Sequence, residues 1–434
     1  MKFEDLNLNN PLLNALDDMG LDTPTLIQEK SFSVIMSGKD MLGIAQTGTG
    51  KTLAYLLPAL RLWQFAKNPF PQILIIVPTR ELVMQVCDEI VRLTSYMNVV
   101  TVGVYGGANI NTQAAKIVEG VDVVVGTPGR VMDLMLHGDL VPKNIKRFII
   151  DEVDETLNMG DGHQLKTILD LLPKKKQSLL FSATMNEDIE EMIDNHFIDP
   201  IYVEAAPAGT PVDKIQQYIY TAPNYNTKIN LLHYLLKDEK LKKILIFTES
   251  KKHADALYEI LVEKQGEQVD VIHSNKAQNY RFNAVTKFKN NELRILVATD
   301  LVSRGMDINE VTHVINMNIP AKTENYIHRI GRTGRQGMTG IAITLFSPFE
   351  GEQLKAVESY MQKTIEKLSL PEEVEISDLL TVDEQPEVKM KNQLGKLPRR
   401  ENVGLSFHEK KLKNQIDKKV NLKPRQKKRI KKKR

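Results

Sequence analysis

Short apolar runs alternate with helical stretches along most of the chain, and this alternation is the feature that most narrows its possible fold. Strands that alternate with helices predict a parallel sheet with helices packed on both faces. The alternation occurs in two successive series, which predict an α/β fold of two tandem, doubly wound parallel-sheet domains. The expected strands are residues 41–45, 73–77, 99–104, 122–126, 148–150 and 178–181, and then 217–220, 243–247, 269–272, 294–298, 313–316 and 340–346.

The length of 434 residues agrees with this division, because a chain of this size exceeds one ordinary hydrophobic core. Between the two series lies a segment of small residues punctuated by Pro207 and Pro211, which is typical of a loop. We therefore expect one domain over residues 1–207 and a second over 208–370. The β pattern stops near residue 365, and we expect residues 371–434 to form an acidic and then basic tail that is disordered.

The charge of the chain is strongly asymmetric. Its formal net charge is +3, but residues 391–434 contain 18 Lys and Arg against 3 Asp and Glu, so the first 390 residues carry −12. A basic tail on an acidic body indicates a flexible arm for a polyanion. A tail that only aids solubility or directs localisation remains the alternative.

The sequence also indicates where the protein functions. Its first residues lack the basic start and apolar stretch of a secretory signal, and its apolar runs are too short to span a bilayer. The single cysteine, Cys87, cannot form an internal disulfide, which suits a reducing compartment. We therefore expect a cytoplasmic protein with no membrane contact and no stable oligomer.

A phosphate-binding loop follows the first expected strand. A helical run begins directly after it, and backbone N–H groups at such a helix start can surround phosphates. In this pattern Lys51 reaches the terminal phosphates and Thr52 holds Mg²⁺. The first position is alanine instead of glycine, which still permits a tight turn. The loop predicts ATP and Mg²⁺ as ligands and consists of Ala45, Gln46, Thr47, Gly48, Thr49, Gly50, Lys51 and Thr52.

A second acidic signal follows the apolar strand at residues 148–150. Asp151 comes directly after this strand, where α/β phosphate-loop proteins hold Mg²⁺ through an aspartate. The adjacent Glu152 can orient and deprotonate an attacking water molecule. An ordinary acidic loop is the alternative, and the paired phosphate loop disfavours it.

Together with the phosphate loop, Asp151-Glu152-Val153-Asp154 resembles the signature of the DEAD-box RNA helicases, with valine in the third box position. Other motifs of that family match in order and spacing over residues 1 to about 365. The resemblance implies two RecA-like domains, RNA-dependent ATP hydrolysis and unwinding of RNA duplexes. The matching segments are Gly20 to Gln28 with the upstream Phe3, Pro78 to Leu82, Gly106-Gly107, Thr127 to Arg130, Ser182 to Thr184, Gln278 with Arg281, Ala298 to Asp300, Arg304 to Asp307 and His328 to Arg335.

The resemblance assigns roles to residues around the nucleotide. Gln28 would recognise the adenine edge, since an amide can donate and accept hydrogen bonds, and Phe3 would stack on the ring. Phe3 as a mere anchor of the N-terminus is the alternative. Asp307 would contact the ribose. Arg332 and Arg335 would reach the γ-phosphate from the second domain, so that hydrolysis requires domain closure.

Two further groups of residues complete the implied machinery. Four polar residues would couple hydrolysis to closure, although ordinary structural hydrogen bonding explains them almost as well; they are Asp154, Ser182, Thr184 and His328. Another group would hold the RNA backbone without reading bases, through helix starts and guanidinium groups. This RNA-facing group is Arg80, Gly107, Thr127, Gly129, Arg130 and Thr299.

The sequence departs from the family pattern at three places. Val153 replaces alanine and should only repack its surroundings. Asp161-Gly162 stands where an aromatic residue is usual, and His273-Ser274 replaces the common His-Gly. The compact core and short basic tail are most like the bacterial RhlE-like branch, with single-stranded and duplex RNA as expected ligands and ribosome-assembly or RNA-decay proteins as possible partners. A DNA-translocating helicase and a non-catalytic RNA clamp are the competing interpretations.

Overall fold

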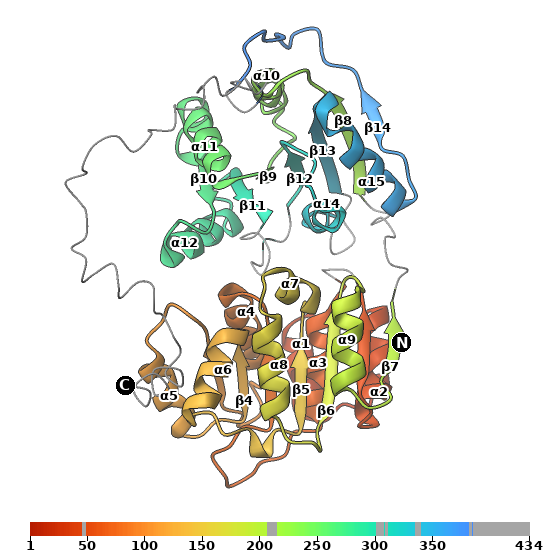
Figure 1. Ribbon diagram of the computed structural model, residues 1–434, viewed down its shortest axis with the longest axis vertical. Coiled ribbons are helices and arrows are strands. Elements are labelled where there is room, and N and C mark those ends of the chain that lie inside the picture. The colour runs from red at the N-terminus through yellow and green to blue at the C-terminus, as the bar shows by residue number, and fades with distance from the viewer. Residues whose placement is uncertain are drawn as a thin grey trace, which may run out of the picture. The chain divides into compact units, whose positions relative to one another are not determined.

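The computed structural model describes residues 1–45, 49–205, 215–300, 308, 311–334, 340–381 and 384. In this part of the chain the strands form two seven-stranded sheets, and every strand pair is parallel (Figure 1). We call the segment around the first sheet the first lobe and the segment around the second sheet the second lobe. The two RecA-like, doubly wound sheets expected from the sequence are thereby confirmed.

The first sheet has the strand order β3-β4-β2-β5-β6-β1-β7. Its interior strands are buried on both faces, which explains why they read as continuous apolar runs instead of alternating ones. The strands are β1 (Met41–Ile44), β2 (Ile73–Ile76), β3 (Thr101–Val104), β4 (Val123–Gly126), β5 (Arg147–Ile150), β6 (Gln177–Ser182) and β7 (Ile201–Glu204).

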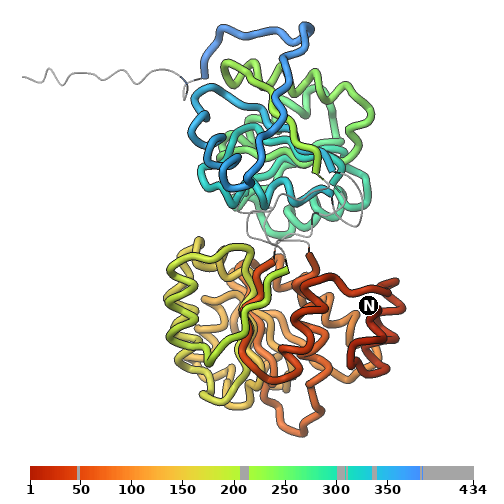
Figure 2. Tube along the Cα trace, turned by 90° about the vertical axis from the view of Figure 1, so that its right-hand side faces the viewer, coloured from red at the N-terminus to blue at the C-terminus, as the bar shows by residue number. Residues whose placement is uncertain are grey.

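Helices cover both faces of this sheet (Figure 2). Neighbouring strand residues point to opposite faces, so Met41 packs with the apolar side chains of α1–α4, whereas Leu42 packs with those of α6, α8 and α9. The helices are α1 (Asn10–Asp18), α2 (Leu26–Met36), α3 (Lys51–Arg61), α4 (Arg80–Leu93), α5 (Ile110–Val118), α6 (Pro128–His137), α7 (Val153–Asn158), α8 (Gly162–Leu171) and α9 (Glu187–His196), with 3-10 turns η1 (Phe3–Asp5) and η2 (Pro142–Asn144).

The second sheet repeats this arrangement with the order β10-β11-β9-β12-β13-β8-β14. One of its faces packs against α12, α14 and α15, and the other packs against α10 and α11. The strands are β8 (Ile215–Thr221), β9 (Ile244–Thr248), β10 (Val269–Ile272), β11 (Ile295–Thr299), β12 (His313–Asn316), β13 (Gly340–Phe346) and β14 (Glu366–Leu368); the helices are α10 (Tyr225–Leu235), α11 (Lys251–Gln265), α12 (Gln278–Lys289), α14 (Thr323–Ile330) and α15 (Gly351–Met361), with η3 (Gly266–Gln268) and η4 (Pro348–Glu350).

The structure corrects two expectations about the end of the second lobe. The β pattern does not stop near residue 365, because β14 pairs in parallel with β8. Part of the expected disordered tail, residues 371–379, also packs on this lobe. Val374 is buried against α10 and α11, and Asn230 of α10 donates a hydrogen bond of 2.9 Å to the carbonyl oxygen of Glu375. Apolar burial and polar side chains of α10 therefore hold a segment whose acidic composition alone favours disorder.

Two other expectations fall outside the described residues. The domain boundary at 207/208 lies in the undescribed segment 206–214, and the basic segment 391–434 lies entirely beyond the described part of the chain. Within the described residues, no helix combines the length and apolar character needed to cross a bilayer.

Candidate active site and nucleic-acid interface

The phosphate loop connects β1 to α3. Strand β1 lies inside the first sheet between β6 and β7, and α3 begins at Lys51. Gly50 precedes the helix with φ of +88°, a left-handed conformation that glycine adopts without strain. The Lys51 side chain is buried, and its Nζ has no hydrogen-bond partner among the described residues. Gln46, Thr47 and Gly48 of the predicted loop lie outside those residues.

Gln28 connects α2 to the end of this loop. Its Nε2 donates a hydrogen bond of 3.0 Å to the carbonyl oxygen of Gly50, while its Oε1 accepts one of 2.8 Å from the backbone N–H of Thr25. The second bond belongs to a capping box that begins α2. A Cβ on Gly50 would lie 2.4 Å from the Gln28 Nε2, so the contact requires glycine. Gln28 therefore adjoins the phosphate loop through both its position and its amide.

The carboxylates Asp151 and Glu152 lie at the end of β5. Asp151 is 3% exposed, and its backbone N–H donates to the carbonyl oxygen of Ile76 on β2. Glu152 has φ of +49°, a left-handed conformation that costs a non-glycine residue on the order of 1–3 kcal/mol and that is frequent at functional sites. One of its carboxylate oxygens, Oε2, is buried without a hydrogen-bond partner among the described residues.

Burial raises the pKa of both carboxyl groups, and the positive charge of Lys51 partly opposes the rise. For Glu152, the negative charge of Asp151 raises the pKa further, and the guanidinium of Arg332 lowers it. Carboxyl groups whose pKa is raised by burial and lowered by a nearby lysine are typical of catalytic sites. The sequence prediction placed these residues on one site, and the structure brings them together.

Tyr55 is a residue of this site that the sequence prediction missed. It lies on α3 four positions after Lys51, so both side chains share one helix face. Its fully buried ring packs against Phe181, with ring centroids 5.3 Å apart, and the negative charge of Asp151 acts on its buried hydroxyl. Burial and the Asp151 charge raise the pKa of Tyr55 well above its ordinary value, so the hydroxyl stays protonated. The one sequence signal for Tyr55 is its spacing of four residues from Lys51, which places both side chains on the same face of α3.

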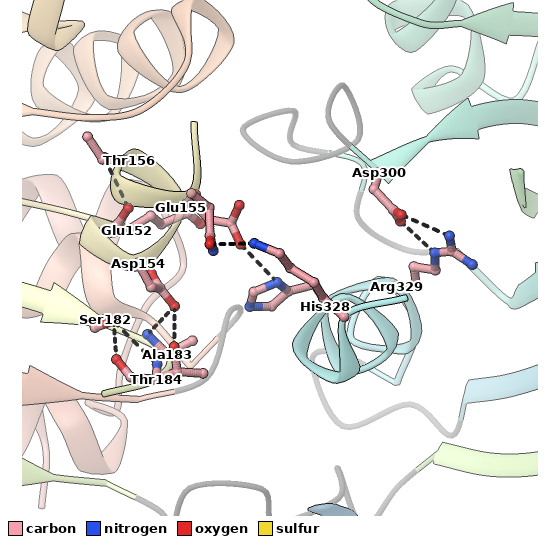
Figure 3. Close-up of polar contacts among 12 residues, drawn as sticks. Glu152, Asp154, Glu155, Thr156, Ser182, Ala183, Thr184, Asp300, His328 and Arg329 are labelled. Atoms are coloured by element: carbon pink, nitrogen blue, oxygen red, sulfur yellow. Dashed lines mark hydrogen bonds and ion pairs between the residues drawn. The ribbon is translucent and has the colours of Figure 1, made fainter. Parts of the chain in front are cut away.

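The predicted coupling residues of the first lobe form one hydrogen-bonded group (Figure 3). Asp154 Oδ2 accepts from the Thr184 hydroxyl at 3.2 Å and from the backbone N–H of Ala183 at 3.3 Å. The Ser182 hydroxyl donates to the carbonyl oxygen of Thr184 at 2.6 Å. The segment after β6 is thus attached to α7, which directly follows Asp151 and Glu152.

His328 has a partner that the sequence prediction did not name. Its Nδ1 lies 3.3 Å from Oε1 of Glu155, the residue that follows the four-residue box (Figure 3). Both side chains are buried, at 10% and 4% exposure. Asp154, another of the predicted coupling residues, accepts hydrogen bonds from Ala183 and Thr184. Glu155 carries no distinguishing sequence pattern beyond its position after the box.

The RNA-facing residues of the first lobe lie at helix starts that follow adjacent strands. Thr79 caps α4 after β2, and Thr127 precedes α6 after β4. At the start of α6 an added Cβ on Gly129 would meet no atom within 4 Å, so this backbone is open to an approaching phosphate. Arg130 donates to Gln113 Oε1 at 2.6 Å and to the carbonyl oxygen of Ala108 at 2.9 Å, which fixes its guanidinium.

Arg80 packs on Gly107, because a Cβ on Gly107 would lie 2.3 Å from its Nη1. The same Nη1 donates to Gln278 Oε1 at 3.3 Å, and the neighbouring Glu81 forms a 2.7 Å ion pair with Arg281. Gln278 and Arg281 match a motif of the DEAD-box resemblance, and the sequence indicated no role for either residue. They pair with the residues at the start of α4.

In the second lobe, Thr299 ends β11 and is buried. The next residue, Asp300, forms a bidentate ion pair with Arg329 of α14, in which the Arg329 Nη2 lies 2.8 Å from the Asp300 Oδ2 (Figure 3). Arg332 follows α14 and is 4% exposed. Asp307 and Arg335, to which the sequence assigns the ribose and the γ-phosphate, lie outside the described residues.

Phe3 is 4% exposed and packs in the first-lobe core, and its backbone N–H donates to the carbonyl oxygen of Asp22 at 3.1 Å. A hollow of about 360 Å³ lies beside it, lined in part by Leu21 and Asp22. Cys87 is packed beside Gly103, and burial raises the pKa of its thiol to about 12.

The residues at the ends of β1 and β5 fit a nucleotide phosphate with Mg²⁺. The Lys51 Nζ, which no described residue hydrogen-bonds, supplies a buried cation for phosphate oxygens. Asp151 supplies a carboxylate where a metal is held in phosphate-loop proteins. The described residues contain no cluster of three or more His, Cys, Asp and Glu side chains that could hold a metal by itself. Mg²⁺ would therefore depend on Thr52, Asp151 and the phosphates together.

Fold and site define a two-lobed phosphate-loop nucleotide-binding protein. Residues 25–192 match the DEAD/DEAH box helicase family, and residues 227–337 match the helicase conserved C-terminal domain. The chain is 38% identical over 388 residues to the DEAD-box ATP-dependent RNA helicase RhpA of Helicobacter pylori, covering 89% of this chain and 76% of that protein. This chain belongs to the DEAD-box helicase family.

Two further comparisons agree with this family membership. The DEAD-box ATP-dependent RNA helicase CshA of Geobacillus kaustophilus is 37% identical, over 85% of this chain and 78% of its own length. The structure of S. cerevisiae Dbp5 bound to RNA and ADP BeF3 superposes with a TM-score of 0.76 at 28% identity, covering 85% of this chain and 95% of that one.

Proposed function

We propose that this protein is an ATP-dependent RNA helicase that binds single-stranded RNA across both domains and locally separates short duplexes, with ATP hydrolysis resetting the clamp. The observation that carries the proposal is the buried group of Lys51, Asp151 and Glu152, in which Lys51 Nζ and Glu152 Oε2 lack hydrogen-bond partners among the described residues. Buried polar atoms without partners are costly unless a ligand completes them. ATP and its attacking water supply what these atoms lack.

The hydrolytic chemistry follows from the charges in place. Glu152 orients the attacking water and accepts its proton, and the burial that raises its pKa makes it a stronger base. Lys51 holds the terminal phosphates, and Thr52 and Asp151 would hold Mg²⁺, which would supply positive charge to them. Arg332, with Arg335, stabilises the charge that develops on the γ-phosphate. Gln28 recognises adenine, with Phe3 and Asp307 completing the nucleotide contacts.

RNA binding is assigned to a second group of residues, which the helix starts of α4 and α6 support. Backbone N–H groups and guanidinium groups hold phosphates without reading bases, so binding is independent of sequence. The group is Arg80, Gly107, Thr127, Gly129, Arg130 and Thr299. Contacts between Asp154, Ser182 and Thr184, together with His328, relay nucleotide hydrolysis to the RNA surface.

The finer features of the protein are also proposals. We assign the chain to the RhlE-like branch, acting in the cytoplasm on single-stranded and duplex RNA, without a stable oligomer. Val153, the variant residue of the box, is fully buried in the first-lobe core, so its extra methyl groups repack and catalysis is retained. The domains divide near residue 207, and the basic segment 391–434 tethers structured RNA.

Strand separation tests this function. A short RNA duplex with a single-stranded overhang is incubated with the protein, Mg²⁺ and ATP, and strand release is followed by fluorescence. The wild type should release the strand with ATP and not without it, and Lys51→Ala should abolish release while the matched surface variant Lys116→Ala retains it. Release from a DNA duplex at the RNA rate would instead indicate a DNA helicase, and no release with either duplex would refute the proposal.

A further inference from the structure

Three successive residues of the second lobe each accept a hydrogen bond from, or donate one to, a charged side chain that is buried or mostly buried. They are Met317, Asn318 and Ile319, which connect β12 to the segment before α14. We call residues 317–319 the α14 entry loop. Lys228 Nζ of α10 donates to the Met317 carbonyl oxygen at 2.9 Å, and Arg329 Nη1 donates to the Asn318 carbonyl oxygen at 2.8 Å.

The third contact with the α14 entry loop comes from Glu350, at the end of η4. Its Oε1 accepts from the backbone N–H of Ile319 at 2.8 Å, and its Oε2 accepts from the backbone N–H of Ser347 at 2.7 Å. The same Oε2 lies 2.8 Å from Lys228 Nζ. The Lys228 and Glu350 side chains are 6% and 16% exposed, so this ion pair is shielded from solvent.

A shielded ion pair of this kind is not needed for a stable fold. Removing two charges from water costs several kcal/mol per ion, and well-packed apolar residues often stabilise a protein as well or better. The pair instead fixes the positions of three backbone groups. The Lys228 and Glu350 side chains hydrogen-bond to the backbone of Met317, Ile319 and Ser347. Charged groups form stronger and more directional hydrogen bonds than neutral ones.

The α14 entry loop leads to the residues that carry function. Helix α14 spans only Thr323–Ile330, contains His328 and is separated from Arg332 by Gly331 alone. Lys322 gives the helix no side-chain cap, and Arg329 of the helix donates to the Asn318 carbonyl oxygen, so the entry loop helps to anchor the helix. The segment after the helix is anchored by Thr333, whose hydroxyl donates to the carbonyl oxygen of Thr312 at 3.2 Å. A shift of the entry loop would therefore tilt α14 and displace Arg332.

We propose that Lys228 and Glu350 are positioning residues for ATP hydrolysis, which hold the α14 entry loop so that Arg332 is aimed correctly. The proposal rests on the hydrolytic role assigned to Arg332 under the proposed function. Lys228 and Glu350 contact no nucleotide and act only through the backbone of residues 317–319. Misplacement of a reacting group by 1 Å can cost about 10²-fold in rate, so small shifts at this loop have measurable effects.

Lys228→Met tests the proposal in the full chain. Methionine keeps the length of the side chain and removes the cation, which frees the Met317 carbonyl oxygen and leaves Glu350 without its counter-charge. We expect kcat for RNA-stimulated ATP hydrolysis to fall about tenfold or more. The KM for ATP should stay within about twofold of the wild-type value. Binding that is equally strong in the ground state and the transition state comes from Gln28 and Lys51 of the first lobe, which the substitution leaves in place.

A matched control separates positioning from stability. Lys243 is also buried in the second lobe, and its Nζ donates to the carbonyl oxygen of Lys289 at 3.2 Å, away from the entry loop. Lys243→Met should therefore retain the wild-type kcat even if its melting temperature falls as much as that of Lys228→Met. If Lys228→Met does not fold, the double variant Lys228→Met/Glu350→Gln, which leaves no uncompensated charge, takes its place with the same expected loss of kcat.

The outcomes are distinct. A wild type without RNA-stimulated hydrolysis would refute the proposed function itself. An active wild type with unchanged kcat in the folded Lys228 variant would overturn only the positioning role. An equal loss of kcat in Lys243→Met, or a change confined to KM, would also overturn it.

Discussion

The side-chain amide of Gln28 donates a hydrogen bond of 3.0 Å to the carbonyl oxygen of Gly50, which links the start of α2 to the residue that begins the phosphate-loop helix. The same amide group also accepts a hydrogen bond from the Thr25 backbone N–H in the capping box of α2, so Gln28 connects this helix to the phosphate loop. A residue in this position can report the presence of the base to the loop that binds the phosphates.

Gln28→Ala should raise the KM for ATP about tenfold and reduce the preference for ATP over GTP, because an unmade hydrogen bond to a base edge is costly. Steady-state hydrolysis with both nucleotides at saturating RNA measures this. Gln216→Ala, at an exposed position of β8, is the matched control and should leave both values unchanged. Unaltered selectivity in the Gln28 variant would exclude adenine recognition by this residue.

The nucleotide-free protein should lose stability as pH rises, because burial raises the pKa of Glu152 above its ordinary value of 4.5. The folded state keeps a proton that the unfolded chain releases, so the contribution is fully present below 4.5 and is lost as pH rises through the folded pKa. Glu152→Gln should therefore melt about 2–4 °C above the wild type at pH 8, with a smaller difference at pH 5. Thermal unfolding at both pH values checks this, with the exposed Glu187→Gln expected to show no gain at either. A gain that does not depend on pH would contradict the argument.

Thr184→Val removes the 3.2 Å hydrogen bond between the Thr184 hydroxyl and Asp154 while keeping the side-chain shape. If this contact couples hydrolysis to RNA rearrangement, duplex separation should fall about tenfold with a smaller fall in ATP hydrolysis. Thr167→Val, which removes a hydroxyl from the exposed face of α8, serves as the control. Equal losses of both activities would mean that the contact only supports the fold.

Arg130→Ala should weaken RNA binding and lower the slope of log K against log salt by about one, because one phosphate contact is lost. Arg92→Ala, an exposed position at the end of α4, should leave the slope unchanged. Binding titrations with a single-stranded RNA at several salt concentrations measure both. An undiminished slope for Arg130→Ala would remove this residue from the RNA-facing group.

The sequence predicted the interior strands within two residues at each end, because strands buried on both faces leave long apolar runs. It missed β7, which lies at a sheet edge and is partly exposed, and β14, which lies at the other sheet's edge and has the polar sequence Glu366–Leu368. An edge strand needs only one partner strand and little burial, so its residues carry a weak signal.

The residues of the candidate site also divide into those that the sequence predicts and those that it does not. Lys51, Asp151 and Glu152 could be predicted because each follows an apolar strand within a motif of fixed spacing. Tyr55, Glu155 and Lys228 could not, since their roles depend on which side chains the fold places beside them. The packing of residues 371–379 was missed for the same reason: their composition favours disorder, and the asparagines of α10 that hold them are distant in sequence.

The most direct test of the account is ATP turnover with and without single-stranded RNA, in the wild type and in Glu152→Gln. The account predicts turnover by the wild type that RNA stimulates and a DNA oligomer of the same sequence does not, together with a loss of about 10²-fold or more in Glu152→Gln when the base is removed. Equal turnover by both proteins, with and without RNA, would contradict it.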